Sequence, residues 1–515
     1  MTSAGPDPVP VAASAPRTTP PTAPGPGDAP APTPAGRRRL PTLPLVVVGG
    51  LVLLNLVLRL VLAHKALPAP LAGDEVAYTT GARDLAAAAQ ALLEGGAVPT
   101  ADLQAHLVGN GWFMPGMSLL IAPLFLADPT AGDEAVRVYL GVLSTVVFLG
   151  AVALVARTVG LRTAAVLLVV PGLIPMWVLF GFSAWGDAWA GLVLLATVPL
   201  LVVMWRRLDS DGAVRVRDAV LLGLALVVAL YLRSSTLPLV VAVLAVLVVV
   251  TLLRTRGRAL ARSLAACAAA AAVVVVLLAP WSAIMTRTFG ERVTTTTTMS
   301  LSLAYAFGDR DELCFGPCVE GNIWTNMARY ARAVGEQTGE NPLEVRRQMR
   351  AYAMRDVTPS GYAATVLDDF SRYAFSPASY DHVFRPPVED GDAPPPQQAS
   401  DTVSIAVTHG MYDAAVGAAA VAILVARRVR PDAQVMVVVA SGMLALLMSQ
   451  PFVHVSSGRY WPVFAPLLGI AIAGLLAPAD PATWSPALRR TQRVLAVGWV
   501  VAVGALFLVA GFAAG

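Results

Sequence analysis

The stretch Leu45–Ala63, LVVVGGLVLLNLVLRLVLA, carries one charged side chain in an apolar run long enough to cross a bilayer. Runs of similar length recur from there to the C-terminus. The 515-residue chain is 56% hydrophobic and 14% charged, with a mean hydropathy of +0.65, whereas an ordinary soluble domain is about a quarter charged. These properties predict an all-α polytopic membrane protein. The net charge of +4 is spread over short loops and does not indicate a nucleic-acid partner.

Hydropathy predicts about 11 transmembrane helices, because an apolar segment of roughly 20 residues spans a bilayer. The expected spans are residues 45–63, 136–156, 163–181, 186–205, 219–233, 236–253, 263–281, 404–426, 433–452, 460–478 and 494–513.

Clusters of arginine fall in alternate segments between these spans. Basic residues concentrate in cytoplasmic loops, so the side that carries the clusters is expected to be the cytoplasm. In a plasma membrane, the N-terminus would then lie on the cytoplasmic side and the C-terminus on the outer side. The clusters are Arg37–Arg39, Arg157 with Arg162, Arg206, Arg207, Arg215 and Arg217, Arg254, Arg256, Arg258 and Arg262, Arg427, Arg428 and Arg430, and Arg489, Arg490 and Arg493.

This topology divides the chain into four parts. Residues 1–44 are rich in Pro and Ala and are expected to form a disordered cytoplasmic tail, followed by a signal anchor rather than a cleaved signal peptide. Residues 45–281 form an N-terminal transmembrane module with a first extracytoplasmic loop at 64–135. Residues 282–403 form a large second extracytoplasmic loop, and residues 404–515 the C-terminal transmembrane helices.

The second loop holds two local features. Cys314 and Cys318 flank a short Phe-Gly-Pro turn in an oxidising compartment, which favours a disulfide between them over a metal site that would need two further ligands. Further along, Asn341 followed by Pro342 predicts a capped helix start, with the helix ending near Thr358.

Three carboxylates and three arginines are predicted to meet at the outer membrane boundary. Ionisable groups near lipid are costly and usually functional. The carboxylates are Asp74, Glu75 and Asp187, and the arginines are Arg59, Arg233 and Arg459. The competing interpretation is a solvated Asp-Glu pair and arginines that anchor helices to lipid phosphates. It does not suit Asp187, because a carboxylate gains nothing from anionic headgroups.

Several short motifs, in this order along the chain, resemble the GT-C glycosyltransferases of the protein O-mannosyltransferase and aminoarabinose-transferase type. The resemblance extends over most of the chain after residue 44. One departure is Ile284-Met285, where the family usually has Arg-Asn. The motifs are Leu58-Arg59-Leu60, Gly73-Asp74-Glu75-Val76-Ala77-Tyr78, Ala82-Arg83-Asp84-Leu85, Leu93-Glu94-Gly95-Gly96, Gly111-Trp112-Phe113-Met114-Pro115-Gly116, Glu134-Ala135-Val136-Arg137, Pro280-Trp281 with Phe289-Gly290, and Ser457-Gly458-Arg459-Tyr460-Trp461-Pro462 with Pro466.

The resemblance implies inverting transfer of a sugar, mannose-like or another, from a polyprenyl-phosphate donor to a lipid, glycan or protein acceptor at the extracytoplasmic face. A carboxylate would deprotonate the acceptor hydroxyl, and arginines would meet the charge of the leaving phosphate. In this reading Asp74 is the base, Glu75 assists, and Asp187 orients the acceptor or the base. Donor phosphate ligands would be Arg233, Arg459 and Arg59.

Three alternatives stay open. A transporter or flippase for a lipid-linked sugar would also have many spans, although such proteins usually carry internal repeats and polar residues at mid-membrane. A non-catalytic membrane scaffold could share the fold. No cofactor is required by the expected reaction, but a divalent metal held by Asp74 and Asp187 is the remaining option, disfavoured because no His accompanies them.

Overall fold

The computed structural model describes residues 42–307, 323–375, 450–453 and 458–475, which form helices and no strands. Apart from Thr42, these residues belong to one compact unit, Leu43–Gly515. The tail predicted for residues 1–44 lies outside the described residues, except for its end, which begins the first helix. The predicted Cys314–Cys318 disulfide also lies outside them.

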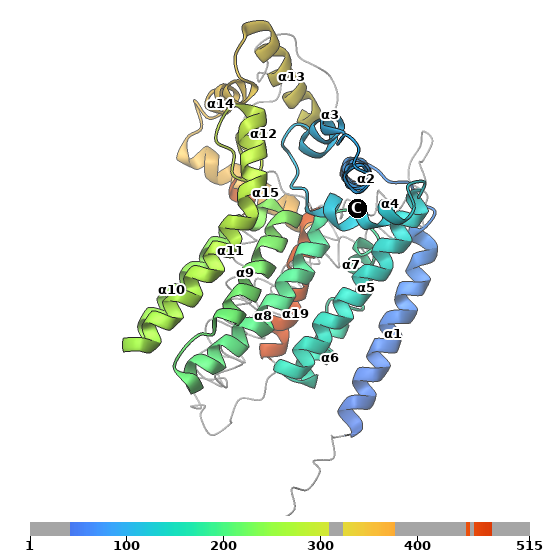
Figure 1. Ribbon diagram of the computed structural model, residues 1–515, viewed down its shortest axis with the longest axis vertical. Coiled ribbons are helices and arrows are strands. Elements are labelled where there is room, and N and C mark those ends of the chain that lie inside the picture. Colours follow the sequence, from blue (N-terminus) through green and yellow to red (C-terminus); the bar gives the residue numbers. More distant parts are fainter. Residues whose placement is uncertain (1–41, 308–322, 376–449, 454–457, 476–515) are drawn as a thin grey trace, which may run out of the picture. The chain divides into compact units, whose positions relative to one another are not determined.

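Five described helices are long and apolar enough to cross a membrane, which confirms the helical membrane character of the chain. They are α1 (Thr42–Ala66), α5 (Asp133–Thr158), α8 (Gly186–Asp211), α10 (Leu237–Arg254) and α11 (Gly257–Phe289). A shorter apolar helix, α9 (Val216–Leu232), packs between α8 and α11 (Figure 1).

The span predicted at 163–181 is two short helices, α6 (Leu161–Val169) and α7 (Pro175–Phe180). The prediction was wrong here because hydropathy does not register backbone breaks. Pro171 has no N–H to continue the helix and disfavours the helical conformation of the residue before it. Pro175 then begins α7 at a position that tolerates proline.

The later spans are described only in part. The predicted span 460–478 is a 3₁₀ helix, η5 (Gly458–Val463), followed by α19 (Ala465–Leu475). Of the span predicted at 433–452, the structure describes the 3₁₀ turn η4 (Gln450–Phe452). The predicted spans 404–426 and 494–513 lie outside the described residues, so the count of 11 stays a prediction.

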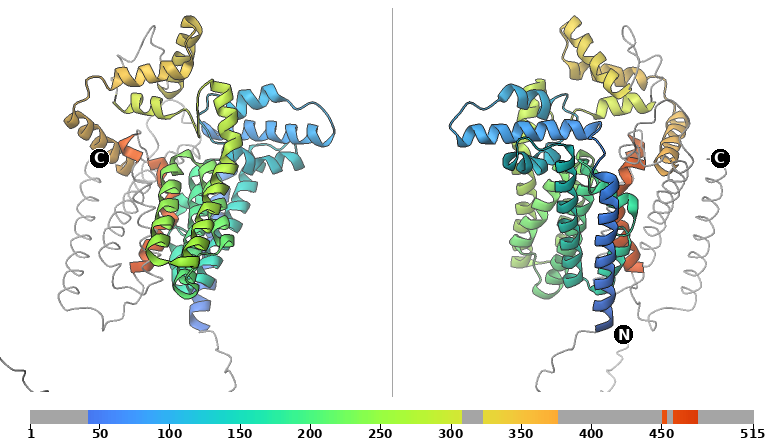
Figure 2. Two further views of the ribbon diagram at one scale, coloured as in Figure 1. Left: turned by 60° about the vertical axis from the view of Figure 1, so that its left-hand side comes forward. Right: turned by 90° about the vertical axis from the view of Figure 1, so that its right-hand side faces the viewer.

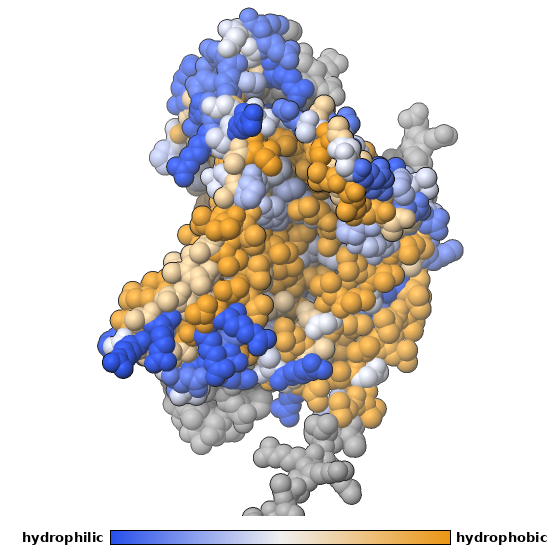
Figure 3. Space-filling model, viewed as in Figure 1, coloured by the Kyte–Doolittle hydropathy of each residue, from blue (hydrophilic) through white to orange (hydrophobic). Residues whose placement is uncertain are grey.

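Three of the arginine clusters lie at the same end of the helices. Arg206 at the end of α8 donates to the carbonyl of Thr158 at the end of α5, with a distance of 2.6 Å. Arg254 at the end of α10 lies 3.5 Å from Asp209 of α8. Hydrophilic residues gather at these ends, below the apolar face of the helices (Figure 3). This common placement agrees with the charge alternation read from the sequence.

The first loop forms helices at the opposite ends. They are α2 (Asp74–Leu93), α3 (Thr100–Asp102), the π-helix η1 (Leu103–Val108) and α4 (Gly116–Ala127). α2 packs along α4 and runs across the direction of α1 (Figure 2).

The second loop contributes α12 (Met299–Phe307), α13 (Ile323–Thr338), α14 (Pro342–Ala353) and α15 (Pro359–Phe375). A small core of its own holds the first three of these helices together: Leu301, Ala304, Tyr330, Ala331, Val345 and Met349. The Asn341 side chain accepts from the Leu343 amide at 2.8 Å, which confirms the predicted helix start. The helix ends at Ala353 rather than near Thr358, because the chain turns before α15 begins.

Glycine lets three helix ends meet near the candidate site. A Cβ on Gly186, the first residue of α8, would lie 2.0 Å from the carbonyl oxygen of Leu232 in α9. A Cβ on Gly116, the first residue of α4, would lie 2.4 Å from the backbone of Tyr231. The starts of α4 and α8 therefore pack directly on the end of α9.

We expect Gly186→Ala to destabilise the protein by about 1–3 kcal/mol, because the neighbour it strikes is backbone and cannot rotate away. The measurement is thermal unfolding of the detergent-solubilised protein. Gly150→Ala is the control, since Gly150 lies inside α5 with open space around it. Equal unfolding midpoints for the two variants would show that α8 and α9 are not in this close contact.

Candidate functional site

The first feature of the site is a buried ion pair between Glu75 and Arg137. Gly73 takes the left-handed φ of 57° that glycine adopts without strain, and α2 begins at the next residue. Glu75 is fully buried, and the guanidinium of Arg137 in α5 donates two parallel hydrogen bonds to its carboxylate, at 2.5 and 2.9 Å. This two-pronged geometry is the strong form of an Arg–carboxylate contact.

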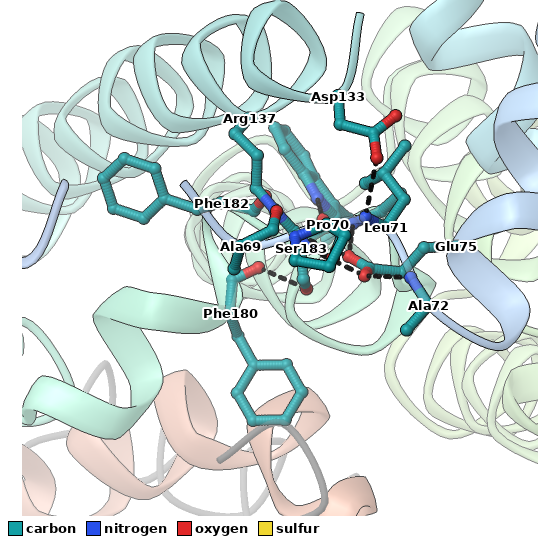
Figure 4. A network of polar contacts seen from close by, with 12 residues as sticks. Ala69, Pro70, Leu71, Ala72, Glu75, Asp133, Arg137, Phe180, Phe182 and Ser183 are labelled. Atoms are coloured by element: carbon teal, nitrogen blue, oxygen red, sulfur yellow. Dashed lines mark hydrogen bonds and ion pairs between the residues drawn. The ribbon is translucent and has the colours of Figure 1, made fainter. Parts of the chain in front are cut away.

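The Glu75–Arg137 pair ties three segments together (Figure 4). Arg137 also donates to the carbonyls of Ala69, Pro70 and Phe182. The Glu75 carboxylate accepts in addition from the amides of Ala72, at 3.2 Å, and Ala184, at 2.9 Å. The segment before α2, the helix α5 and the loop before α8 are thus held around one carboxylate, whose hydrogen-bonding capacity is filled by the protein.

The second feature is an ion pair between Asp187 and Arg233. Asp187 is the second residue of α8 and is 1% exposed, and Arg233 follows the end of α9 in an extended conformation. The Arg233 guanidinium lies 4.4 Å from the centre of the Tyr460 ring, a cation–π contact. Sequence analysis predicted that Asp187 and Arg233 share one site, and the structure brings them together.

Asp187 differs from Glu75 in its hydrogen bonding. Oδ1 of the Asp187 carboxylate is in contact with the Arg233 guanidinium, whereas Oδ2 has no hydrogen-bond partner among the described residues. Buried carboxylate oxygens normally accept hydrogen bonds, so the Asp187 carboxylate has capacity to accept one from a bound hydroxyl.

Asp74 lies beside this arrangement through its neighbour in the chain. It is the first residue of α2 and is half-buried. The hydrogen bond that the Ala184 amide donates to Glu75 brings the start of α2 to the loop before α8. Ala184 is three residues from Asp187, at most about 10 Å along the chain. Asp74 and Asp187 both occupy the first turn of a helix, where the helix dipole stabilises negative charge.

Arg59 lies among the transmembrane helices, and the structure does not bring it together with Arg233. Its Nε donates to Asn55 at 3.1 Å, and its Nη1 donates to Ser144 and Thr145 of α5 at 3.2 and 3.1 Å. The aromatic ring of Phe148 lies 5.5 Å away. These contacts fasten α1 to α5.

The structure describes the backbone of Arg459, within η5, but its side chain lies outside the described residues. The adjacent Tyr460 reaches the site through its contact with Arg233. In the described part of the chain, no group of three or more His, Cys, Asp or Glu side chains forms a metal-binding cluster. A metal shared by Asp74 and Asp187 stays an untested alternative.

No protein-family model, curated protein or solved structure matches this chain. The resemblance to GT-C glycosyltransferases therefore depends on the quoted motifs alone, and the function must be argued from the site.

Sequence analysis missed the role of Arg137, although its signal was present. Arg137 falls just inside the predicted span 136–156, and a charged residue within a span usually has a buried partner. The partner could not be identified from the sequence because it lies 62 residues away.

Proposed function

We propose that this protein is an inverting glycosyltransferase that moves a sugar from a polyprenyl-phosphate donor to an acceptor at the extracytoplasmic membrane face. The observation that carries the proposal is the Asp187–Arg233 pair, a buried carboxylate with unfilled hydrogen-bonding capacity beside a guanidinium. A sugar transfer from a lipid phosphate needs both groups, one for a hydroxyl and one for the phosphate.

Arg233 is the phosphate ligand in this proposal. Its planar fork matches phosphate oxygens and keeps its charge as the phosphate leaves, so no general acid is required. The Tyr460 ring packs on one face of the guanidinium, and the donor phosphate would approach its edge, beside Asp187. Arg233 directly follows the end of α9. In this proposal the phosphate binds there while its polyprenyl chain stays in the bilayer.

Asp74 is the proposed base, and Asp187 orients the acceptor hydroxyl. Glu75 is not proposed as the base because Arg137 and two amides occupy its oxygens. We therefore assign Glu75 a positioning role: it holds Asp74 close to the start of α8. A base on the face opposite the leaving phosphate inverts the anomeric carbon.

The orientation proposed for the site is extracytoplasmic. The arginine clusters at the far ends of α5, α8 and α10 support it, because basic residues mark the cytoplasmic side.

The test is transfer from a labelled polyprenyl-phosphate sugar, measured in sealed right-side-out and inverted membrane vesicles. We expect transfer when the donor is supplied to right-side-out vesicles, and Arg233→Lys should lower it about tenfold or more, since lysine keeps the charge but loses the fork. Arg215→Lys is the control, because Arg215 is an exposed residue paired with Asp211 at the opposite helix ends. Movement of the intact donor across the membrane without transfer would support the flippase alternative instead.

A further inference from the structure

Two arginines lie together in the α12–α14 region, apart from the residues assigned to sugar transfer. Arg346 of α14 is 3% exposed, and its Nη1 donates to the Thr297 hydroxyl at 2.6 Å and to the Asn110 carbonyl at 3.4 Å. Arg332 of α13 donates to the Asn110 side-chain oxygen. Two guanidinium groups from different helices therefore converge on Asn110.

No described carboxylate balances the charge of this pair. Among the described residues, no carboxylate lies within ion-pair distance of Arg346 or Arg332, and the Nε of Arg346 has no hydrogen-bond partner. Burial lowers the pKa of Arg346 to about 10, and the nearby positive charge of Arg332 contributes to the shift. An isolated buried charge is costly, so its retention needs a reason.

Arg347, the next residue in the chain, has the usual surroundings of an arginine in a folded protein. Arg347 is paired with Glu291, at 2.5 and 2.9 Å, and with Glu344. These carboxylates raise the pKa of Arg347 above its usual value. Neighbouring arginines on one helix thus have opposite surroundings. Arg347 is neutralised and partly exposed, whereas Arg346 is buried with no counter-charge among the described residues.

The loop that carries Asn110 is held firmly in place. Gly111 has a φ of 70°, and a Cβ there would lie 2.8 Å from side-chain atoms of Met285, Phe289 and Thr297. The Thr297 amide also donates to the Gly111 carbonyl at 2.8 Å. The groups around the two guanidiniums are therefore preorganised rather than free to collapse onto the charge.

We propose that Arg346 and Arg332 form a binding site for a phosphate-type oxyanion. Two guanidinium forks with a free Nε–H suit phosphate oxygens, and the anion would supply the missing counter-charge. The site is distinct from Arg233, to which it is connected through the first loop. The chain runs from Asn110 to Gly116, beside the end of α9, in six residues, which span at most about 20 Å. The phosphate could belong to a soluble molecule or to a lipid headgroup.

The test is binding to the full-length protein in a neutral detergent, by calorimetric titration with inorganic phosphate at constant ionic strength. We expect Arg346→Gln and Arg332→Gln each to weaken binding about tenfold or more, because each removes charge-assisted hydrogen bonds. Arg347→Gln should bind as the wild type does. If Arg346→Gln fails to fold, Arg332→Gln decides, since its side chain is exposed.

The source of the anion is tested in nanodiscs of phosphatidylcholine with or without phosphatidylglycerol. Stabilisation of the wild type, but not of Arg332→Gln, by the anionic lipid alone would assign the site to a headgroup. Equal phosphate binding by all the variants, or no response to phosphate or to anionic lipid, would overturn the proposal. These binding tests do not depend on sugar transfer, so their failure would leave the proposed glycosyltransferase function unaffected.

Discussion

Asp74→Asn is expected to lower sugar transfer by about 10²–10⁴-fold, the usual contribution of a general base. Asparagine keeps the size of the side chain and its place at the start of α2, but it cannot accept the proton of the acceptor hydroxyl. Donor binding should be retained, because the phosphate ligand in the proposal is Arg233. Initial rates with the labelled donor and a parallel donor-binding measurement separate the two effects.

The control for this variant is Asp84→Asn on the same helix. Asp84 lies 2.8 Å from His106, on a partly exposed surface, and has no role in the proposed reaction. The Asp84→Asn variant should therefore transfer sugar at the wild-type rate. Full activity in Asp74→Asn would remove Asp74 as the base, and the losses in Asp187→Asn and Glu75→Gln would then identify which other carboxylate acts.

Breaking the Glu75–Arg137 pair should have the largest effect on stability. Glu75→Ala and Arg137→Ala are each expected to cost about 3–5 kcal/mol, because each leaves a buried charge without its partner. The double variant should cost less than the sum of the two, since it leaves no unpaired charge. Thermal or denaturant unfolding of the detergent-solubilised protein measures all three.

The Asp211–Arg215 pair provides the comparison, since both of its side chains are largely exposed. Asp211→Ala should leave the unfolding midpoint unchanged, because exposed ion pairs contribute little. Additive effects in the Glu75 and Arg137 variants would mean that the two side chains do not interact in the folded protein.

The spans were the most predictable part of the fold. The apolar runs in α1, α5, α8, α10 and α11 are continuous in sequence, so their length and character are local properties. The segment 163–181 differed because its prolines break a run that remains apolar. Hydropathy measures transfer into lipid, not the continuity of backbone hydrogen bonds.

The candidate site was predictable by residue type but not by pairing. Asp187 and Arg233 were singled out because charges at span ends are expensive, and they are partners in the structure. Glu75 was predicted to share the work of Asp74, yet its oxygens are occupied by groups 62 and 109 residues away in the chain. Two adjacent carboxylates look alike in sequence, and only their tertiary partners distinguish them.

The Glu75 network also has a consequence for synthesis of the chain. Glu75 leaves the ribosome well before its partners, with Arg137 following 62 residues later and the Ala184 amide 109 residues later. Until α5 is inserted, the Glu75 carboxylate must remain hydrated, because burying its charge without the Arg137 partner is too costly. The start of α2 can therefore settle into its final place only after the loop before α8 has been made. The segment between α1 and α5 is therefore translated early but assembled late.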